Sequence, residues 1–259
     1  MVIPDDDMDL SELRSPLTKC IQQELQGEVG VLFSGGLDSA VLTALSREHC
    51  RPVLYTVGYP NSHDLKAGEK GAQELDLPWK AVILNDDELR KGVRFLRDRL
   101  GLSDPLVISF ELPLYFVCSQ AKESILVSGQ GADELFAGYD RYRSLAADEL
   151  EKALLGDQER LLAEGGPREA DLVRMFDKRL VCPYLCPDVV RVARTFSPGE
   201  MIGPEGNKLP LRRLAAALGL SAANSPKKAA QYGSGIMSAM KKCSSREGKE
   251  LRSWVAEVE

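Results

Sequence analysis

The sequence has no apolar run that approaches the ~20 residues a membrane-spanning helix requires. Its N-terminus, Met1-Val2-Ile3-Pro4 followed by three aspartates, has neither the basic region nor the apolar core of a signal peptide. We therefore expect no membrane association and a cytoplasmic location.

The sequence also lacks a surplus of positive charge, since its formal net charge is −6 at pH 7. Extended contacts to nucleic-acid phosphates need surplus lysine and arginine, so we do not expect a large nucleic-acid interface. Basic clusters at residues 90–99 and 227–242 leave an RNA substrate open as an alternative.

Metal-binding side chains of the zinc type are sparse. The six cysteines form no Cys-x-x-Cys pair, and His49 and His63 are the two histidines, which argues against a structural zinc site. Cys182 and Cys186 are the one close pair of cysteines. We expect them to be buried structural side chains rather than reactive ones.

What is present begins with the segment 31–39, Val-Leu-Phe-Ser-Gly-Gly-Leu-Asp-Ser, in which an apolar strand leads through two glycines into a helix. Gly35 and Gly36 have no Cβ, so the turn can adopt dihedrals closed to other residues and direct backbone N–H groups at an anion. The N-terminus of the helix would face the same anion. A carboxylate at Asp38 would repel a phosphate unless a cation lay between them, which implies Mg²⁺ with Asp38 as a ligand. The competing interpretation is that Asp38 and Ser39 only cap the helix.

A second segment, 125–139, repeats this design: an apolar strand, a glycine-spaced loop, and the pair Asp133 and Glu134 at the start of a helix. Two such loops at the carboxyl ends of parallel strands would face each other across one crevice. Asp133 would then share the metal with Asp38. The competing interpretation is that Asp133 and Glu134 only complement the helix dipole.

Alternating strands and helices predict an α/β fold with a mostly parallel, doubly wound sheet covered on both faces. The expected strands are 29–33, 52–57, 79–84 and 125–128, and the expected helices are 11–26, 38–49, 64–75, 86–100 and 105–121. After Tyr139 the pattern becomes helical, with a Gly/Pro break at 165–167. We expect one catalytic domain made of an N-terminal helix (1–27), a nucleotide-binding α/β core (28–145) and a helical substrate-side part (146–259).

The loop Ser34-Gly-Gly-Leu-Asp-Ser39 resembles the pyrophosphatase loop (PP-loop) of the ATP pyrophosphatases, enzymes that split ATP between its α- and β-phosphates to adenylate a substrate. It lacks the Gly-Lys-Ser/Thr ending of a Walker A loop. The stretch 128–134, Ser-Gly-Gln-Gly-Ala-Asp-Glu, resembles the Ser-Gly-Glu-Gly-Ala/Ser-Asp-Glu loop of the asparagine synthetase family. The resemblance covers about residues 28–245 and implies an adenine nucleotide alpha hydrolase-like fold, with ATP and Mg²⁺ as cofactors.

The resemblance also implies roles for individual residues. It assigns the pyrophosphate to the loop residues Ser34, Gly35, Gly36 and Ser39, the adenine to Leu32 and Val57, the ribose or adenine to Ser128 and Gly129, and the metal to Asp38 and Asp133. Segments 207–212 and 226–235 resemble the closing segments of the family, where a lysine reaches back to the phosphates. The spacing leaves open whether this catalytic lysine is Lys227 or Lys228.

The chain departs from the family pattern at Gln130, where the family has a glutamate thought to handle the proton of incoming ammonia. An amide cannot take up that proton at neutral pH, so we expect intact adenylation chemistry and a changed amide-forming half. The pattern also places an expected arginine at Val181 and an expected aspartate at Cys186. Valine cannot provide the bidentate fork that an arginine offers to a substrate carboxylate.

The glutaminase domain of the family is absent from this sequence, which reaches the PP-loop at Ser34. The expected nitrogen donor is therefore free ammonia, another amine, or ammonia from a separate glutaminase subunit. The sequence predicts an asparagine-synthetase-like, ATP-dependent amide ligase that acts on a small-molecule carboxylate. One alternative is a tRNA-modifying or sulfur-transferring relative, which would need Cys182, Cys186 or a sulfur donor. Another is a non-catalytic AMP/ATP sensor, suggested by Gln130.

Overall fold

The computed structural model describes residues 10–224 and 233–259, so Lys227 and Lys228 lie outside the described residues. Its centre is a sheet of five strands in the order β3-β2-β1-β4-β5, and every neighbouring pair is parallel. The strands are β1 (Glu28–Leu32), β2 (Arg51–Gly58), β3 (Trp79–Ile83), β4 (Ile125–Val127) and β5 (Arg179–Val181). The predicted α/β fold with a mostly parallel sheet is therefore confirmed.

The chain builds this sheet outward in both directions from β1. It first adds β2 and β3 on one side, then crosses back to add β4 and β5 on the other. The direction reverses between β1 and β4, where Val31 lies opposite Val127. A reversal of this kind opens a crevice at the carboxyl ends of the two strands, which is where ligands bind in open α/β sheets.

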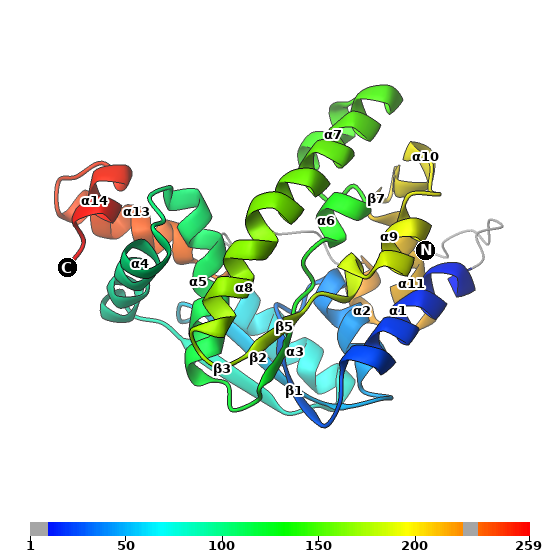
Figure 1. The fold of residues 1–259 in the computed structure, drawn as a ribbon, viewed down its shortest axis with the longest axis horizontal. Helices are drawn as coiled ribbons and strands as arrows, with labels where there is room; N and C mark the ends of the chain where they lie inside the picture. Colours follow the sequence, from blue (N-terminus) through cyan, green and yellow to red (C-terminus); the bar gives the residue numbers. More distant parts are fainter. Residues whose placement is uncertain (1–9, 225–232) are drawn as a thin grey trace.

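Helices cover both faces of the sheet, in two groups that lie at the left and right of Figure 1. One group consists of α1 (Leu10–Glu24), α2 (Leu37–Ser46), α9 (Pro187–Ala193) and α11 (Leu209–Ala217). The other consists of α4 (Asp86–Leu100), α5 (Pro105–Gln120), α13 (Ile236–Arg246) and α14 (Leu251–Glu257). Successive strand residues serve opposite cores, because Leu54 packs with the first group and Tyr55 with the second. Helix α3 (His63–Leu75) packs on β2 and β3.

The part of the chain after Tyr139 is mainly helical, as predicted, but it also supplies β5 to the sheet. The short helix α6 (Ala132–Leu135) lies between β4 and this part. The remaining elements after Tyr139 are α7 (Ala147–Arg160), α8 (Gly166–Arg174), α10 (Pro198–Met201), the hairpin of β6 (Ile202–Gly203) and β7 (Gly206–Asn207), and the 3₁₀ turns Asp140–Ser144, Pro183–Leu185 and Ser221–Asn224. The division at residues 27 and 145 stays a prediction.

The predicted break at residues 165–167 is wrong. A π-helical turn, Leu161–Gly165, joins α7 directly to α8, and the three segments rise from the sheet as one rod. Gly165 (φ −65°, ψ −55°) and Gly166 (φ −58°, ψ −50°) both have right-handed helical dihedrals, so the chain stays helical up to Pro167 in the first turn of α8. Because Pro167 has no N–H, it cannot donate a hydrogen bond to the preceding turn, and the π-helical turn lies directly before it.

Among the described residues no single helix is long and apolar enough to cross a membrane. Helices α4 and α5 meet the length and composition criterion only when taken together, and they are bent by 105° at their junction.

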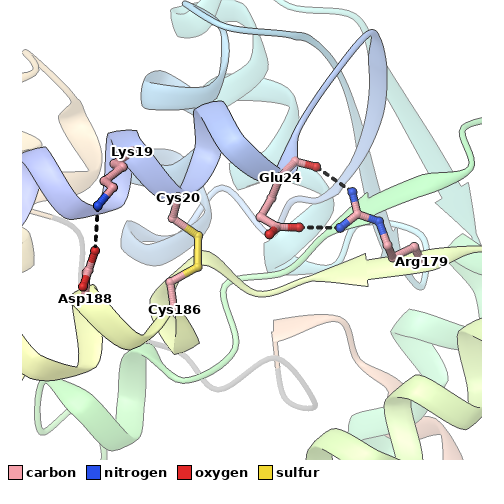
Figure 2. Close-up of a disulfide and its surroundings, with 6 residues drawn as sticks. All are labelled: Lys19, Cys20, Glu24, Arg179, Cys186 and Asp188. Atoms are coloured by element: carbon pink, nitrogen blue, oxygen red, sulfur yellow. Dashed lines mark hydrogen bonds and ion pairs between the residues drawn. A yellow bond between two sulfur atoms is a disulfide. The ribbon is translucent and has the colours of Figure 1, made fainter.

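A disulfide joins Cys20 on α1 to Cys186, which lies 166 residues later at the start of α9 (Figure 2). Two ion pairs flank it, Lys19 with Asp188 at 3.1 Å and Arg179 with Glu24 at 2.6 Å. Cys186 therefore has a structural role, as expected, but as half of a disulfide and at a partly exposed position rather than as a buried apolar side chain. Its partner lies on a helix remote in sequence, and its neighbour Cys182 is a free thiol.

We expect Cys20→Ser to lower the free energy of unfolding by about 3 kcal/mol, because the disulfide restricts the unfolded chain over a long loop. Urea unfolding of oxidised protein measures this difference. Wild-type protein in excess dithiothreitol should unfold at the midpoint of the variant, and the variant itself should not respond to dithiothreitol. An unchanged wild-type midpoint in dithiothreitol would contradict the expectation.

Candidate active site

The loop after β1 depends on Gly35. Its φ of +70° is left-handed, and a Cβ at this position would overlap the backbone of Ala67 on α3. Gly36 differs from the prediction, because its φ of −81° and ψ of 172° form ordinary extended backbone. The N–H of Gly36 donates to Ser34 Oγ at 3.3 Å. The special conformation thus resides in one glycine, which also allows the loop to pack directly on α3.

Asp38 and Ser39 do not cap α2, so the competing interpretation of this motif is wrong. The N-cap is Gly36, which has no side chain with which to cap the helix. Ser39 Oγ donates to the Gly36 carbonyl at 3.2 Å and lies 3.5 Å from Ser34 Oγ. The two hydroxyls therefore line the loop, and the Asp38 carboxylate is available for a longer-range contact.

The loop after β4 lies against the start of α2. A Cβ at Gly129 would lie 3.2 Å from the Asp38 Cβ, so this glycine permits a close approach of the two loops. Ser128 N–H donates to the Val181 carbonyl at 3.0 Å, and its Oγ accepts from the Gln130 N–H at 3.2 Å. Gly131, with φ of +91°, then opens α6. The two loops face each other at the sheet reversal, as predicted.

Lys208 joins the two carboxylates that the sequence singled out. Its Nζ lies 2.6 Å from Asp38 Oδ2 and 2.6 Å from Asp133 Oδ1. The lysine side chain is 4% exposed, against 28% and 25% for the two aspartates. Burial lowers the pKa of Lys208, but the attraction of both carboxylates outweighs burial and raises the pKa above its ordinary value. The lysine is therefore a buried cation at neutral pH.

The backbone accommodates this arrangement. Lys208 has φ of +60° at the N-cap of α11, and a Cβ at Gly138 would overlap both Lys208 and Asp133. A left-handed conformation is rare for a lysine, so the surrounding structure must impose it.

Lys208 is the residue that sequence reasoning missed. Segment 207–212 resembles a closing segment and contains one lysine, but we expected the phosphate-binding lysine at 227 or 228, outside the described residues. Lys208 could have been found from the sequence, because it is the one lysine in a segment that resembles the family.

The donor set at this point suits a divalent cation shared with a substrate. Within residues 10–224 and 233–259, no group of three or more His, Cys, Asp and Glu side chains could hold a metal by itself. Mg²⁺, however, usually takes one or two carboxylates and completes its shell with phosphate oxygens and water. Two carboxylates that converge on one positive charge match that requirement. Their role as metal ligands stays a prediction.

The residues assigned to the nucleotide base gather at the same edge of the sheet. Leu32 ends β1, Val57 is the penultimate residue of β2, and Ser128 and Gly129 directly follow β4. The segment before α13 covers the end of β2, since Tyr59 N–H donates to the Ser234 carbonyl at 2.9 Å. Their nucleotide-binding roles stay predictions, as does the catalytic role of Gln130.

Gln130 contacts side chains from two other elements. Its Nε2 donates to Glu169 Oε1 on α8 at 2.6 Å, and its Oε1 accepts from Cys182 Sγ at 3.7 Å. The positions where an arginine and an aspartate were expected serve the scaffold instead. Val181 is a buried residue of β5, and Cys186 forms the disulfide. Nothing in the sequence pattern around Glu169 indicated that it would meet Gln130.

Comparisons with known proteins agree with the motifs. The family model of asparagine synthase matches residues 12–182. The chain is 34% identical over 173 residues to the putative asparagine synthetase [glutamine-hydrolyzing] 1 of Methanocaldococcus jannaschii, which covers 64% of this chain and 32% of that protein. It is 29% identical over 157 residues to asparagine synthetase B [glutamine-hydrolyzing] of Escherichia coli, and this match covers 53% of this chain and 28% of that protein. The chain thus matches about a third of the length of these relatives.

Two solved structures are also similar. One is a predicted subunit of tRNA methyltransferase from Methanocaldococcus jannaschii, 18% identical, with 80% of this chain and 95% of that chain covered. The other is the NH3-dependent NAD synthetase of Campylobacter jejuni, which is 19% identical, with 65% of this chain and 92% of that chain covered. Both have a TM-score of 0.36, which carries no argument about function.

Proposed function

The chain belongs to the asparagine synthase family, and from this premise we propose that it adenylates a small-molecule carboxylate with ATP and passes the acyl group to ammonia or another amine. The observation that carries the proposal is the convergence of Asp38, Asp133 and Lys208 where the order of the sheet reverses. Acidic and basic groups held so close, next to a glycine-dependent loop, suit the binding of a triphosphate.

In the adenylation step, an oxygen of the substrate carboxylate attacks the α-phosphorus of ATP. The bond to the bridging oxygen breaks, and pyrophosphate leaves with the electron pair. Gly35 and Ser39 would hold the departing pyrophosphate through backbone N–H and hydroxyl groups, with Ser34 and Gly36 in the same loop. Mg²⁺ held by Asp38 and Asp133 would supply positive charge to the phosphates. Lys208 would offset the negative charge that develops on the leaving group.

In the second step, ammonia or another amine attacks the acyl carbon and AMP leaves. Two of the relatives are named as glutamine-hydrolyzing enzymes, and the chain covers about a third of each. We propose that ammonia reaches this site from solution or from a separate glutaminase subunit.

Sulfur transfer is less well supported by the cysteines. Cys186 is bridged to Cys20, so it is not available to pair with Cys182. Burial raises the pKa of the Cys182 thiol, which disfavours the reactive thiolate. The sensor alternative rests on Gln130 alone, and the Asp38, Asp133 and Lys208 arrangement gives no support to it.

ATP–pyrophosphate exchange with a panel of carboxylates, starting with L-aspartate, tests the proposal. We expect exchange that requires both Mg²⁺ and one of the carboxylates. Exchange that requires tRNA instead would favour the tRNA-modifying alternative. Nucleotide binding without exchange under any condition would favour the sensor.

A further inference from the structure

A partly buried cluster of polar side chains surrounds the Gln130 amide. We call it the Glu169 cluster, and it consists of Glu111 from α5, Gln130, Arg168 and Glu169 from α8, and Cys182. Gln130 Nε2 donates to Glu169 Oε1 at 2.6 Å, and Arg168 Nε donates to Glu111 Oε1 at 2.6 Å. Four separate parts of the chain therefore supply polar groups to one hydrogen-bonded cluster.

The Glu169 cluster has unused hydrogen-bonding capacity. Glu169 Oε2 is buried and has no hydrogen-bond partner among the described residues. Gln130 Oε1 accepts only the weak S–H donor of Cys182 there, and a carbonyl oxygen has two lone pairs. A buried carboxylate oxygen without a donor is costly, and in a native protein it marks a place that a ligand or water completes. These two acceptor atoms belong to side chains that are hydrogen-bonded to each other, and such a pair suits a small molecule that carries several N–H donors.

The helix geometry next to the cluster is unusual. The π-helical turn Leu161–Gly165 immediately precedes α8, and a Cβ at Gly165 would lie 3.7 Å from Gln130 Nε2. A π turn holds an extra residue, so it changes which face of the following helix meets its neighbours. Such turns are frequent at functional sites. Here the turn precedes the helix that carries Arg168 and Glu169.

We propose that Glu169, together with the Gln130 carbonyl, binds the amine nucleophile and accepts its proton during amide formation. This inference rests on the proposed function, which requires a proton acceptor that the neutral amide of Gln130 cannot provide. The ligand class is ammonia or a small primary amine. The amine nitrogen would donate N–H hydrogen bonds to Glu169 Oε2 and to the second lone pair of Gln130 Oε1.

The step balances as follows. The nitrogen lone pair forms the C–N bond to the acyl carbon, and the C–O bond to AMP breaks with its electron pair moving to the phosphate oxygen. One N–H proton passes to the Glu169 carboxylate, which becomes a neutral acid. Solvent later removes that proton and restores the acceptor.

The charges around Glu169 set the pH range of this step. Burial raises the pKa of Glu169 most, the Glu111 and Glu134 carboxylates also raise it, and Arg168 and the Gln130 hydrogen bond oppose the rise, so that the pKa lies at about 8. The buried Cys182 thiol also faces Glu169. The ionised form of Glu169 accepts the proton, and this form accumulates as pH rises through the folded pKa. The amine step should therefore accelerate with pH around 8.

Hydroxylamine as the nucleophile and L-aspartate with ATP as the first substrates provide the test. Hydroxylamine is uncharged across this pH range, so its own ionisation does not distort the profile. We expect Glu169→Gln, which keeps the shape of the neutral acid, to reduce hydroxamate formation about 100-fold more than it reduces ATP–pyrophosphate exchange. The rise near pH 8 should disappear in this variant. Glu164→Gln, an exposed site on the π turn, is the matched control and should behave as wild type.

Equal losses of exchange and hydroxamate formation in Glu169→Gln would assign a structural role to Glu169 and overturn the inference, as would unchanged hydroxamate formation. If wild-type protein shows no exchange with any carboxylate, the proposed function fails, and the amine site is then judged by binding. Ammonium chloride should raise the melting temperature of wild type above that in tetramethylammonium chloride at equal ionic strength. The amine site is overturned if that difference is absent from wild type or persists in Glu169→Gln.

Discussion

Replacing Asp38 or Asp133 by asparagine should abolish Mg²⁺-dependent pyrophosphate release, with a loss of about 1,000-fold or more. Each carboxylate accepts from the same buried lysine, and each is a proposed ligand of the metal that neutralises the triphosphate. A metal-bound phosphoryl group gains several kcal/mol of transition-state stabilisation, and each ~1.4 kcal/mol corresponds to tenfold in rate. Asparagine keeps the shape and one oxygen but removes the charge that a hard cation requires.

Pyrophosphate release at a series of Mg²⁺ concentrations measures this effect, and circular dichroism checks that the variants fold. Asp140→Asn is a suitable control, because Asp140 is an exposed carboxylate in the 3₁₀ turn that follows α6. Partial recovery at high Mg²⁺ would agree with weakened metal binding. Near-normal turnover of either variant at ordinary Mg²⁺ would rule out the shared-metal site.

The sequence was informative where local rules decide the structure. Strand β1 and the loop at 34–36 could be predicted because an apolar run, two glycines and an acidic helix start occur within nine residues. The same holds for β4 and its loop. Parallel strands then bring their carboxyl ends to one edge, so the meeting of Asp38 and Asp133 followed from two local patterns and one rule of topology.

The sequence was uninformative where a contact depends on tertiary packing. Strand β5 is as short as β4, but its sequence Arg-Leu-Val is not followed by a glycine-spaced loop, and its pairing with β4 defines it. Cys20 and Cys186 are 166 residues apart, and many pairings of six cysteines are compatible with the spacing. Glu169 lies on α8, which directly follows the π turn, and no pattern of residues predicts that turn. The contact between Glu169 and Gln130 could therefore not be predicted. These contacts all involve residues after Tyr139, as does the missed Lys208, whereas the loops after β1 and β4 could be predicted.

Lys208→Met should reduce ATP–pyrophosphate exchange by about 1,000-fold, mainly through kcat, because the lysine is proposed to act on charge that develops as pyrophosphate leaves. Methionine keeps a similar length and flexibility without the charge. The substitution also leaves Asp38 and Asp133 close together without their shared cation. Breaking a buried ion pair by removing one partner is destabilising by about 3 kcal/mol, since the remaining charges lose their compensation.

The same reasoning gives a test that separates the catalytic role of Lys208 from its structural role. If Mg²⁺ binds between the two aspartates, it should compensate for the missing ammonium and raise the melting temperature of Lys208→Met more than that of wild type. Lys241→Met, at an exposed position on α13, controls for loss of a lysine in general. If Lys208→Met exchanged ATP and pyrophosphate at the wild-type rate, the lysine would have only a structural role as the partner of the two carboxylates. Loss of exchange with stability restored by Mg²⁺ would instead locate the metal between the carboxylates and leave the chemical step dependent on the lysine.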